Sequence, residues 1–577
     1  MSSDPGMWKI VENAEAAGTL FVEGKAQGEI VFCEEGLSFW GGVDPDTGFI
    51  IDTHHSNHGA ALSGKIVLMP TSRGSCSGSG VLLQLARNDN APAALVFCEE
   101  ESILTLGAMI AGRLFDSPVL VMRLPKPVFE ALSYANAAAI DGTELRFDGK
   151  SIRLKTVASD LLDLSEADRR MLDGGDGRAT QAAMEILCLM AAAQNASGFV
   201  DVSRGHIDGC ILAHDANLDF AEKMQRLGAK TRIPTTINAI SVDRENWQSQ
   251  GMVPEFGNKA SRLADAYVKM GCRPTFTCAP YLLDDAPAEG EDIGWSESNA
   301  VIYANSVLGA RTAKHPDYLD LFIAMTGRAP KTGVYLAENR MPECEIAVKL
   351  PGSYDDALWP MLGWLAGTLS PNRIPVLTGL DMARPTEDDL KALCAAFGTT
   401  SAAPMLHVRG HTPEGHLAAV ENAERFDISP ADLAQVWLSF NRAGEKVELV
   451  AIGSPHASLS ECRNFADLLD GQTCDPHTKT IVTVGRKVLA EATSEGIIQR
   501  LENADVQVFP DICWCSITEP LFPTEAKTLF TNSGKYSHYA TGLTGRGVRF
   551  GSLSDCARVA LSGTATKQLP DWLSKYA

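Results

Sequence analysis

The 577-residue sequence predicts an α/β protein with a small N-terminal β/α domain and a large α/β domain made of several subdomains. Apolar segments with the short period of strands alternate with segments of helical period along most of the chain. The length also exceeds what one hydrophobic core supports, because domains of roughly 100–200 residues are usual. Apolar residues make up 45% of the chain and charged residues 21%, as is typical of globular proteins.

Residues 1–150 are predicted to form the small domain. Its expected extended segments are EIVFCEEGLSFW, GFIID, GKIVLMP, AALVFCEE, VLVMRL and TELRF, and its expected helices are GVLLQLARN and ILTLGAMIAGRLF. We place the domain boundary between about residues 150 and 160, because Ser165 and Asp168 form a capping-box pattern that starts a new helix.

Residues 151–577 are predicted to form the large domain. Its first part has the expected helices ATQAAMEILCLMAAA, LDFAEKMQRLG and KASRLADAYVKMG, and the expected strands FVDVS, GCILA, RIPTTI and RPTFTC. Its last part repeats the theme with strands VELVAIG, TIVTVG, VQVFPD, TLFTNS and VRFGS. The stretch from about Lys349 to Val447 is predicted to be a further α/β insertion.

Composition excludes several classes of protein. Asp and Glu number 72 against 50 Lys and Arg, and the resulting charge of −22 repels nucleic acid. The sequence contains no apolar run of 18 or more residues, so we expect no membrane partner. The first residues, MSSDPGMWKIVENAEAAG, lack the apolar core of a secretory signal, which favours a cytoplasmic protein. The 14 scattered cysteines are therefore expected to be thiols.

Thiol, imidazole, hydroxyl and amine groups follow four predicted strands, in positions where open α/β sheets bind ligands. These residues are Cys278, Tyr281, Ser454, His456, Cys513, Ser533 and Lys535. Thiolates hold iron–sulfur clusters, and an open iron can bind a substrate hydroxyl as a Lewis acid. An equally good interpretation is that Cys278 and Cys513 are buried packing residues. Cys515 lies one step further beyond its strand and ranks below Cys513 as a ligand.

A second group of polar residues lies in EDIGWSESNAVIYANSVLGART. It consists of Asp292, Glu297, Ser298, Asn299 and Asn305. Capping of the predicted helix explains one or two of these side chains. The remaining side chains indicate a functional site.

The loop TSRGSCSGSG joins a predicted strand to a predicted helix in the small domain. Its glycines allow a tight turn, and Arg73 together with the helix N-terminus favours an anion, which would help Ser75 or Ser77 to act as a base. A turn that only joins two elements is the simpler interpretation. A third interpretation is a G-x-C-x-G elbow around Cys76, as in glutaminase-type amidotransferases, with the HTPE segment at 411–414 supplying the base.

The same segments resemble the aconitase X family over essentially the entire chain. The segments that carry the resemblance are RGSCSGSGVLLQL, TINAISVD, YVKMGCRPTFTCAPY, GWSESNAVIYANSVLGART, GSPHAS, DICW and NSGKYSHY. The resemblance implies a small swivelling domain that carries the serine loop, in residues 1–150, and a large aconitase-like catalytic domain, in residues 151–577.

The resemblance also implies roles for individual residues. Ser75 would be the base, Lys535 would act with it in catalysis, and Cys278 and Cys513 would bind iron. The implied substrate contacts are Arg73, Ser77, Asn238, Ser298, Asn299, Ser454, His456 and Ser533. Ser454 stands where the resemblance to two-subunit members of the family implies a cysteine, so one expected thiolate is missing. A [2Fe–2S] cluster is therefore favoured over a [4Fe–4S] cluster.

Members with the two parts fused resemble dehydratases of cis-3-hydroxy-L-proline, so the resemblance implies a hydro-lyase that forms Δ1-pyrroline-2-carboxylate. Dehydration of mevalonate 5-phosphate, as in the two-subunit type, or of another small hydroxy acid is an alternative, and a non-catalytic iron-dependent regulator is another. The implied partner is a small hydroxy or imino acid, bound by a monomer or a small homo-oligomer.

Overall fold

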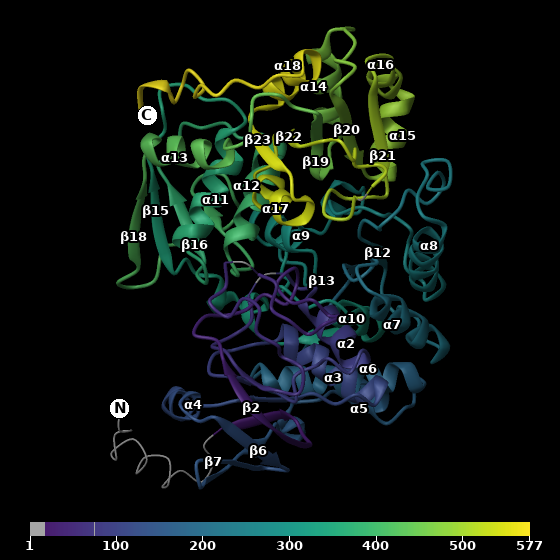
Figure 1. The fold of residues 1–577 in the computed structure, drawn as a ribbon, viewed down its shortest axis with the longest axis vertical. Helices are drawn as coiled ribbons and strands as arrows, with labels where there is room; N and C mark the ends of the chain where they lie inside the picture. The colour runs from purple at the N-terminus through teal and green to yellow at the C-terminus, as the bar shows by residue number, and fades with distance from the viewer. Residues whose placement is uncertain (1–17, 53, 74, 518, 577) are drawn as a thin grey trace. The chain divides into compact units, whose positions relative to one another are not determined.

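The computed structural model describes residues 18–52, 54–73, 75–517 and 519–576 (Figure 1). The chain forms two compact units. Of the described residues, the first unit contains those within 18–202, 214–233 and 315–332, and the second contains those within 203–213, 234–314 and 333–576. In the described part of the chain, none of the helices is both long and apolar enough to cross a membrane.

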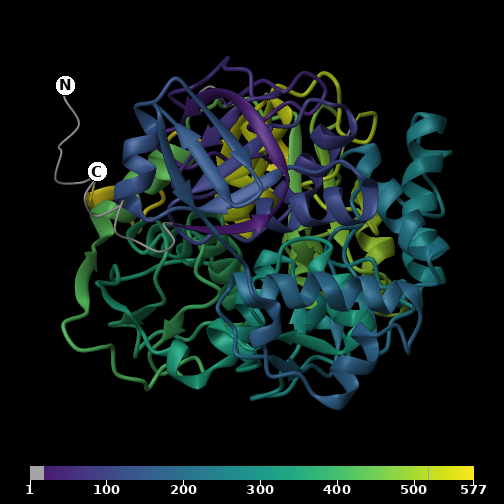
Figure 2. The same ribbon diagram turned by 90° about the horizontal axis from the view of Figure 1, so that it is seen from below.

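The first unit is built on a nine-stranded sheet in the order β8-β7-β6-β2-β3-β4-β5-β1-β9. Its strands are β1 (Thr19–Val22), β2 (Lys25–Phe32), β3 (Ile66–Leu68), β4 (Ala94–Phe97), β5 (Leu120–Arg123), β6 (Ala137–Asp141), β7 (Glu144–Phe147), β8 (Lys150–Arg153) and β9 (Lys155–Thr156). Strands β2 to β5 run parallel, whereas β6 to β8 form an antiparallel meander. Figure 2 shows this meander in blue beside the purple β2.

Helix α2 (Gly78–Arg87) connects β3 to β4, α3 (Ile103–Phe115) connects β4 to β5, and α4 (Lys126–Ser133) connects β5 to β6. The sequence predicts strands β3, β4, β5 and β7 and helices α2 and α3 correctly, because these segments have clear periodicity between turn residues. Strands β3 and β4 are buried at every position, as expected for strands that are covered on both faces.

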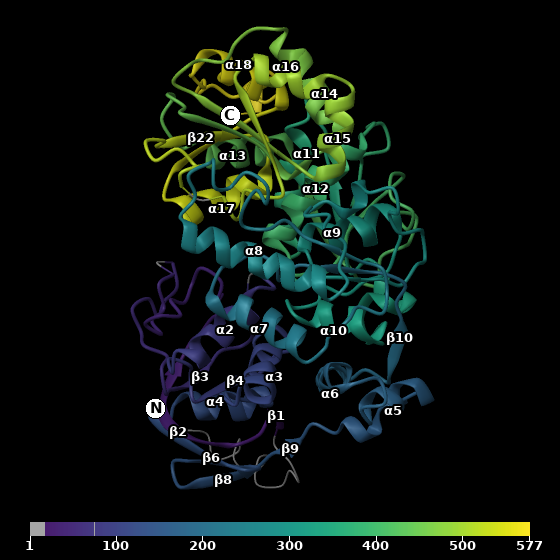
Figure 3. The same ribbon diagram turned by 90° about the vertical axis from the view of Figure 1, so that its right-hand side faces the viewer.

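The rest of the first unit is mostly helical, with η1 (Ser159–Leu161), α5 (Glu166–Leu172), α6 (Arg178–Ala193), α7 (Asp215–Arg226) and α10 (Leu319–Thr326). Strands β10 (Phe199–Asp201) and β14 (Arg328–Pro330) pair antiparallel. The predicted capping box at the start of α5 is confirmed, since Ser165 and Asp168 exchange hydrogen bonds. Figure 3 shows α2 beside α7 in this unit.

The second unit contains three separate parallel sheets. The first sheet has the order β12-β11-β13, with β11 (Gly205–Ile207), β12 (Thr235–Ile237) and β13 (Gly294–Trp295). Helix α8 (Pro254–Lys269) and the turn η2 (Pro280–Leu282) lie between β12 and β13, and α9 (Ser298–Tyr303) and the π-helical η3 (Ala304–Leu308) follow β13.

Two predicted strands near this sheet are wrong. The GCILA segment follows β11 instead of forming a strand, because its backbone donors bind groups outside a strand ladder: Cys210 N binds Asp208 O, and Leu212 N binds the hydroxyl of Ser241. The RPTFTC segment makes one bridge to β12, at Arg273, and then leaves the sheet. Phe276, with φ of +42°, interrupts its extended backbone.

The α/β insertion predicted from about Lys349 to Val447 is present as a four-stranded parallel sheet in the order β17-β16-β15-β18, but it begins earlier than predicted, since β15 precedes Lys349. Its strands are β15 (Cys344–Val348), β16 (Pro375–Thr378), β17 (His407–Val408) and β18 (Glu424–Ile428), and its helices are α11 (Leu358–Leu369), α12 (Glu387–Thr400) and α13 (Pro430–Phe440). Two short turns precede it, η4 (Gly333–Tyr335) and η5 (Ala337–Arg340). Apolar side chains of α11, α12 and α13 share one core with this sheet.

The last sheet is parallel, in the order β21-β20-β19-β22-β23 (Figure 1). Its strands are β19 (Leu449–Ala457), β20 (Lys479–Val484), β21 (Val506–Pro510), β22 (Thr528–Thr531) and β23 (Gly547–Phe550), and all five were predicted. Its helices are α14 (Leu459–Leu469), α15 (Arg486–Ser494), α16 (Ile497–Asn503), α17 (Gly534–Thr544) and α18 (Leu553–Ser562), and η6 (Ser574–Tyr576) ends the described chain. Helices α14, α15, α16 and α18 share one core with the sheet.

Candidate active site

Three cysteines meet in the second unit. Cys278, in the irregular segment after α8, packs with Cys513, which follows β21, and both side chains are at most 3% exposed. Cys515 is partly buried against this pair. The hydrogen bond between Cys513 and Cys278, together with burial, raises the pKa of the Cys513 thiol. The structure thus brings together the two cysteines that the sequence singled out and adds Cys515 to them.

His456 holds the segments that carry Cys278 and Cys513. Its Nε2 donates to the carbonyl of Ile512 at 2.7 Å, so Nδ1 accepts from the hydroxyl of Thr277 at 3.2 Å. Its backbone N–H donates to Cys278 Sγ at 3.3 Å. Burial lowers the pKa of the His456 imidazole to about 4, which keeps the ring neutral. Both ring nitrogens therefore have partners in the protein.

Lys535 and Glu297 form a buried ion pair next to the cysteines. Lys535 Nζ lies 2.9 Å from Glu297 Oε1, and the two side chains are 11% and 12% exposed. Burial opposes the charge on Lys535, but Glu297 and the neighbouring thiols outweigh it and raise the pKa of the ammonium well above its usual range. Burial likewise opposes the charge on Glu297, but Lys535 lowers the pKa of the carboxyl. Both groups are charged at neutral pH.

Two asparagine amides complete this network. Asn238 follows β12 and donates to Glu297 Oε2 at 3.0 Å and to Asp208, which follows β11. Asn299, in the first turn of α9, donates to Glu297 Oε1 at 2.5 Å and to the carbonyl of Cys278 at 3.1 Å.

Tyr281 extends the network by donating to Asn299 Oδ1 at 2.9 Å. Its ring stacks on that of Tyr303 with the centroids 4.1 Å apart. Ser298 is half-buried at the start of α9. The polar group predicted around Glu297 therefore does more than cap a helix.

The end of β22 brings Ser533 and the end of β19 brings Ser454 to the same neighbourhood. Ser533 begins α17, accepts a hydrogen bond from Tyr536 N and donates one to the carbonyl of Ser454. The hydroxyls of Ser454 and Tyr536 are buried and have no hydrogen-bond partner among the described residues. Such groups are costly unless a ligand or water satisfies them.

Two of these residues were not predicted from the sequence. Asp208 directly follows β11. The sequence predicts a strand at residues 209–213 instead, so Asp208 is not recognised as a strand-end residue. Tyr536 is part of the NSGKYSHY segment, and its placement after a strand end was the available signal.

The serine loop lies in the first unit, at the start of α2. The Ser75 hydroxyl is half-buried and accepts a hydrogen bond from Ser77 N at 3.3 Å. Arg73 pairs with Glu35 at 3.3 Å and is largely exposed. Cys76 is buried, with 2% of its side chain exposed.

The amidotransferase interpretation gains no support from its proposed base. His411 is bonded to the carbonyl of Leu380 at 2.9 Å, and Glu414 is bound by the guanidinium of Arg340.

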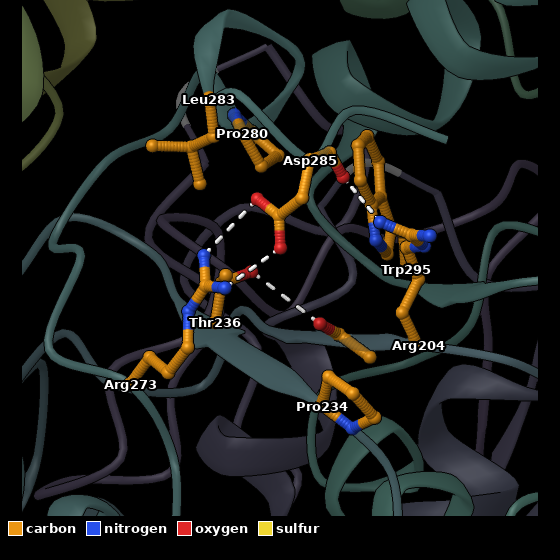
Figure 4. A pocket seen from close by; sticks show the side chains of 9 residues that line it. Arg204, Pro234, Thr236, Arg273, Pro280, Leu283, Asp285 and Trp295 are labelled. Atoms are coloured by element: carbon orange, nitrogen blue, oxygen red, sulfur yellow. Dashed lines mark hydrogen bonds and ion pairs between the residues drawn. The ribbon is translucent and has the colours of Figure 1, made fainter. Parts of the chain in front are cut away.

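A small pocket lies at the opposite, starting edge of the β12-β11-β13 sheet (Figure 4). Its cavity is about 10 Å³, which leaves room for about one water molecule. Arg273 pairs with Asp285 across it at 2.7 Å, and Arg204 donates to the Asp285 carbonyl. Its charges are thus already matched, and the candidate active site lies at the other ends of the strands.

The thiols of Cys278, Cys513 and Cys515 are candidate ligands of a metal centre. Among the described residues, no three His, Cys, Asp or Glu side chains are placed to hold a single metal ion. The donor set nevertheless has the chemistry of an iron–sulfur site, with three thiols at the ends of buried segments and two buried hydroxyls without partners. The residues present therefore fit a thiolate-held iron cluster.

Four family models match the chain in succession. They are described as the aconitase X swivel domain (residues 15–147), first domain (161–338), second domain (342–438) and third domain (447–562).

Curated relatives match nearly the whole chain. The cis-3-hydroxy-L-proline dehydratase of Hypocrea jecorina is 42% identical over 98% of both chains. The enzyme of the same name from Pseudomonas aeruginosa is 44% identical over 96% of this chain and 98% of that one. The phosphomevalonate dehydratase large subunit of Methanothermobacter thermautotrophicus is 31% identical over 66% of this chain and 94% of that one.

A solved structure of the same family is also similar to this chain. The holo-form of Thermococcus kodakaraensis aconitase X covers 69% of this chain and 100% of that chain, with a TM-score of 0.64 and 30% identity. The family models, the relatives and this structure lead to one conclusion: the chain belongs to the aconitase X family, joins all four of its domains in one polypeptide, and is a hydro-lyase.

Proposed function

We propose that this chain dehydrates cis-3-hydroxy-L-proline to Δ1-pyrroline-2-carboxylate, with Ser75 as the base and thiolate-held iron as the Lewis acid. The observation that carries the proposal is the buried Lys535–Glu297 pair beside three cysteines. A fixed cation next to a metal-binding group suits a small substrate that has both a carboxylate and a hydroxyl. The two single-chain relatives bear the name of this activity.

Cys278 and Cys513 would hold the iron, and Cys515 would be the third ligand. When bound, an iron–sulfur centre supplies a Lewis acid for the departing hydroxyl without a change of oxidation state. Because Ser454 stands where the two-subunit members of the family have a cysteine, we propose a [2Fe–2S] cluster in preference to a [4Fe–4S] cluster.

Lys535 and Ser533 would bind the carboxylate of the substrate. One of the three ammonium donors of Lys535 is used by Glu297, so two donors are left for the ligand. Glu297 keeps this ammonium charged and fixes its direction, and Asn238 and Asn299 fix Glu297 in turn. Binding of the carboxylate by a cation would also make the neighbouring α-hydrogen more acidic.

Ser75 would remove that α-hydrogen, and Arg73 and Ser77 would support its loop. The electron pair of the C–H bond forms the C2–C3 double bond as the bond between C3 and the hydroxyl oxygen breaks. The departing hydroxide takes up the proton that Ser75 removed and leaves as water, which restores the base. The resulting enamine moves one proton from nitrogen to C3 and becomes Δ1-pyrroline-2-carboxylate. In this proposal, residues 1–150 act as the swivelling domain and residues 151–577 as the catalytic domain.

A substrate comparison tests the proposal. Protein purified without oxygen is assayed with cis-3-hydroxy-L-proline, trans-3-hydroxy-L-proline and mevalonate 5-phosphate. The iron and sulfide content per protein chain is measured on the same sample. The pyrroline is measured as its coloured adduct with o-aminobenzaldehyde. Turnover of the cis isomer by iron-containing protein supports the proposal. Preference for mevalonate 5-phosphate, or full turnover by iron-free protein, contradicts it.

A further inference from the structure

The segments that carry Cys278 and Cys513 both have a residue in the left-handed region two positions before the cysteine. Phe276 has φ of +42°, and Asp511 has φ of +71°. L-residues other than glycine rarely adopt this conformation, and a bulky phenylalanine does so least readily. The surrounding side chains must therefore hold both segments in place.

Arg486, the first residue of α15, contacts both of these residues. Its Nε and Nη2 each lie 2.6 Å from one oxygen of Asp511, in a two-bonded fork. The same guanidinium lies 5.8 Å from the centre of the Phe276 ring. Arg244 lies 5.6 Å from that ring, and its backbone N–H donates to Asp511 Oδ2 at 3.1 Å.

The start of α15 fits closely against the Cys278 segment. A Cβ added to Gly485, the residue before Arg486, would lie 3.0 Å from Thr277 Oγ1 and 3.2 Å from its Cβ. Glycine at this position therefore lets the helix approach Thr277, the residue next to Cys278. The remaining guanidinium nitrogen of Arg486, Nη1, donates to Glu245 Oε1 at 2.6 Å.

The Asp511 carboxylate has 0% exposure. A buried carboxylate without a partner is very unfavourable, and a planar guanidinium that forms two parallel hydrogen bonds is its best partner. The position of Asp511 is therefore tied to that of Arg486, and the attraction between the guanidinium and the Phe276 ring ties the other segment to the same group.

We infer that Arg486, through its ion pair with Asp511 and its contact with Phe276, is a positioning residue that fixes the relative placement of Cys278 and Cys513. The inference rests on the proposed function, because it assigns these two thiols to iron. Arg486 does not contact either sulfur in this scheme. It determines instead how tightly the cluster is retained, together with His456, which joins the residues immediately before the two cysteines.

The test compares wild type with Arg486→Lys and Asp511→Asn. Lysine keeps the charge but loses the fork, and asparagine keeps the shape of the side chain but loses the charge. Each purified protein receives an excess of an iron chelator, and the visible absorption of the cluster is followed with time. Far-ultraviolet circular dichroism of the same samples establishes that each protein stays folded.

Both variants should release iron about 10–100-fold faster than wild type, with an altered visible spectrum, because groups that orient metal ligands typically contribute that much to metal affinity. The variant that carries both Arg486→Lys and Asp511→Asn should release iron no faster than whichever single variant releases it faster, since the two residues act as one unit. Arg463→Lys is the matched control, because Arg463 on α14 pairs with Glu495 at 2.6 Å at the surface of the same domain. It should release iron at the wild-type rate.

Wild-type release rates and spectra in both Arg486→Lys and Asp511→Asn would overturn the inference while leaving the proposed function intact. An equal acceleration in Arg463→Lys would also overturn it, since any lost ion pair would then have the same effect. Wild-type protein that contains no iron would overturn both the inference and the proposed function.

Discussion

Glu297 links the amine of Lys535 to the amides of Asn238 and Asn299, and these amides link it to Asp208 and to the backbone of Cys278. The charge of Lys535 is therefore supported by a network that reaches the cysteines. Because the pair is buried, each partner depends on the other to remain ionised. The roles of these residues can be tested one side chain at a time.

Replacing Ser75 tests the base. Ser75→Ala should lower kcat by about 10²–10⁴-fold, the usual contribution of a positioned base, while the visible absorption of the cluster stays unchanged. The matched control is Ser72→Ala in the same loop, where the hydroxyl binds Glu101 at 2.6 Å. Steady-state kinetics measures the effect, and a Ser75→Ala enzyme with wild-type kcat would refute the assignment.

Replacing Lys535 tests the carboxylate site. Lys535→Met should lower kcat/KM by roughly 10–100-fold, because a hydrogen bond to a charged group contributes about 1.5–3 kcal/mol. Lys446→Met, which removes an exposed lysine 3.6 Å from Glu448, serves as the control. The measurement is kcat/KM on the proposed substrate, cis-3-hydroxy-L-proline, and equal values for wild type and Lys535→Met would contradict this role.

At the scale of elements, the site collects residues from the carboxyl ends of strands in two parallel sheets. Strands β19, β21 and β22 lead to His456, Cys513 and Lys535, whereas β11 and β12 lead to Asp208 and Asn238. Strand β19 departs from a regular ladder here, since its register with β20 shifts between Ile452 and Ala457. This irregular stretch contains both Ser454 and His456.

Gly453 makes that irregularity possible. Its φ is +98°, and an added Cβ would lie 2.3 Å from the carbonyl of Thr483 on β20. Gly453→Ala should therefore lower the free energy of unfolding by more than about 1–2 kcal/mol, the usual cost of the left-handed conformation alone. Thermal unfolding checks this. The control, Gly542→Ala on the exposed side of α17, should leave stability unchanged or raise it slightly, and equal effects of the two variants would refute the explanation.

At the scale of the whole molecule, each unit buries a neutral histidine. In the second unit, Nδ1 of His206 in β11 is hydrogen-bonded to Thr236 Oγ1 at 2.7 Å. In the first unit, His315 is 2% exposed. Burial lowers the pKa of both imidazoles to about 3. In the unfolded chain an imidazole has a pKa of about 6.5, so the unfolded state binds more protons than the folded state below that pH.

The whole protein should therefore lose stability as the pH falls from about 6.5 towards 3. Each of the two histidines should cost roughly 1 kcal/mol between pH 7.5 and 5.5. His206→Gln should flatten this loss, whatever its effect at pH 7.5, because glutamine does not titrate. Thermal unfolding at a series of pH values measures the slope, and an unchanged slope in His206→Gln would exclude His206 as a cause.

The sequence was sufficient for the elements with clear periodicity and for Cys513, Ser533 and Lys535, which follow the strands β21 and β22. Strand identity depends on local apolar patterns, and parallel strands place their last residues at one edge. The same reasoning failed at RPTFTC, because the positive φ of Phe276 is held by Arg244 and Arg486. Local propensity contains no record of such distant contacts.

What the sequence determined by itself is the α/β class, the alternation of elements and the membership of the family, since all three reside in local patterns and motifs. Only the tertiary structure decided that Lys535 pairs with Glu297, 238 residues earlier, and that Cys515 joins Cys278 and Cys513. It also decided that one ring nitrogen of His456 bonds the Thr277 hydroxyl and the other the Ile512 carbonyl. The physical reason is that burial and long-range pairing determine whether a polar side chain is charged, bound or free, and both depend on residues that meet only in the folded chain.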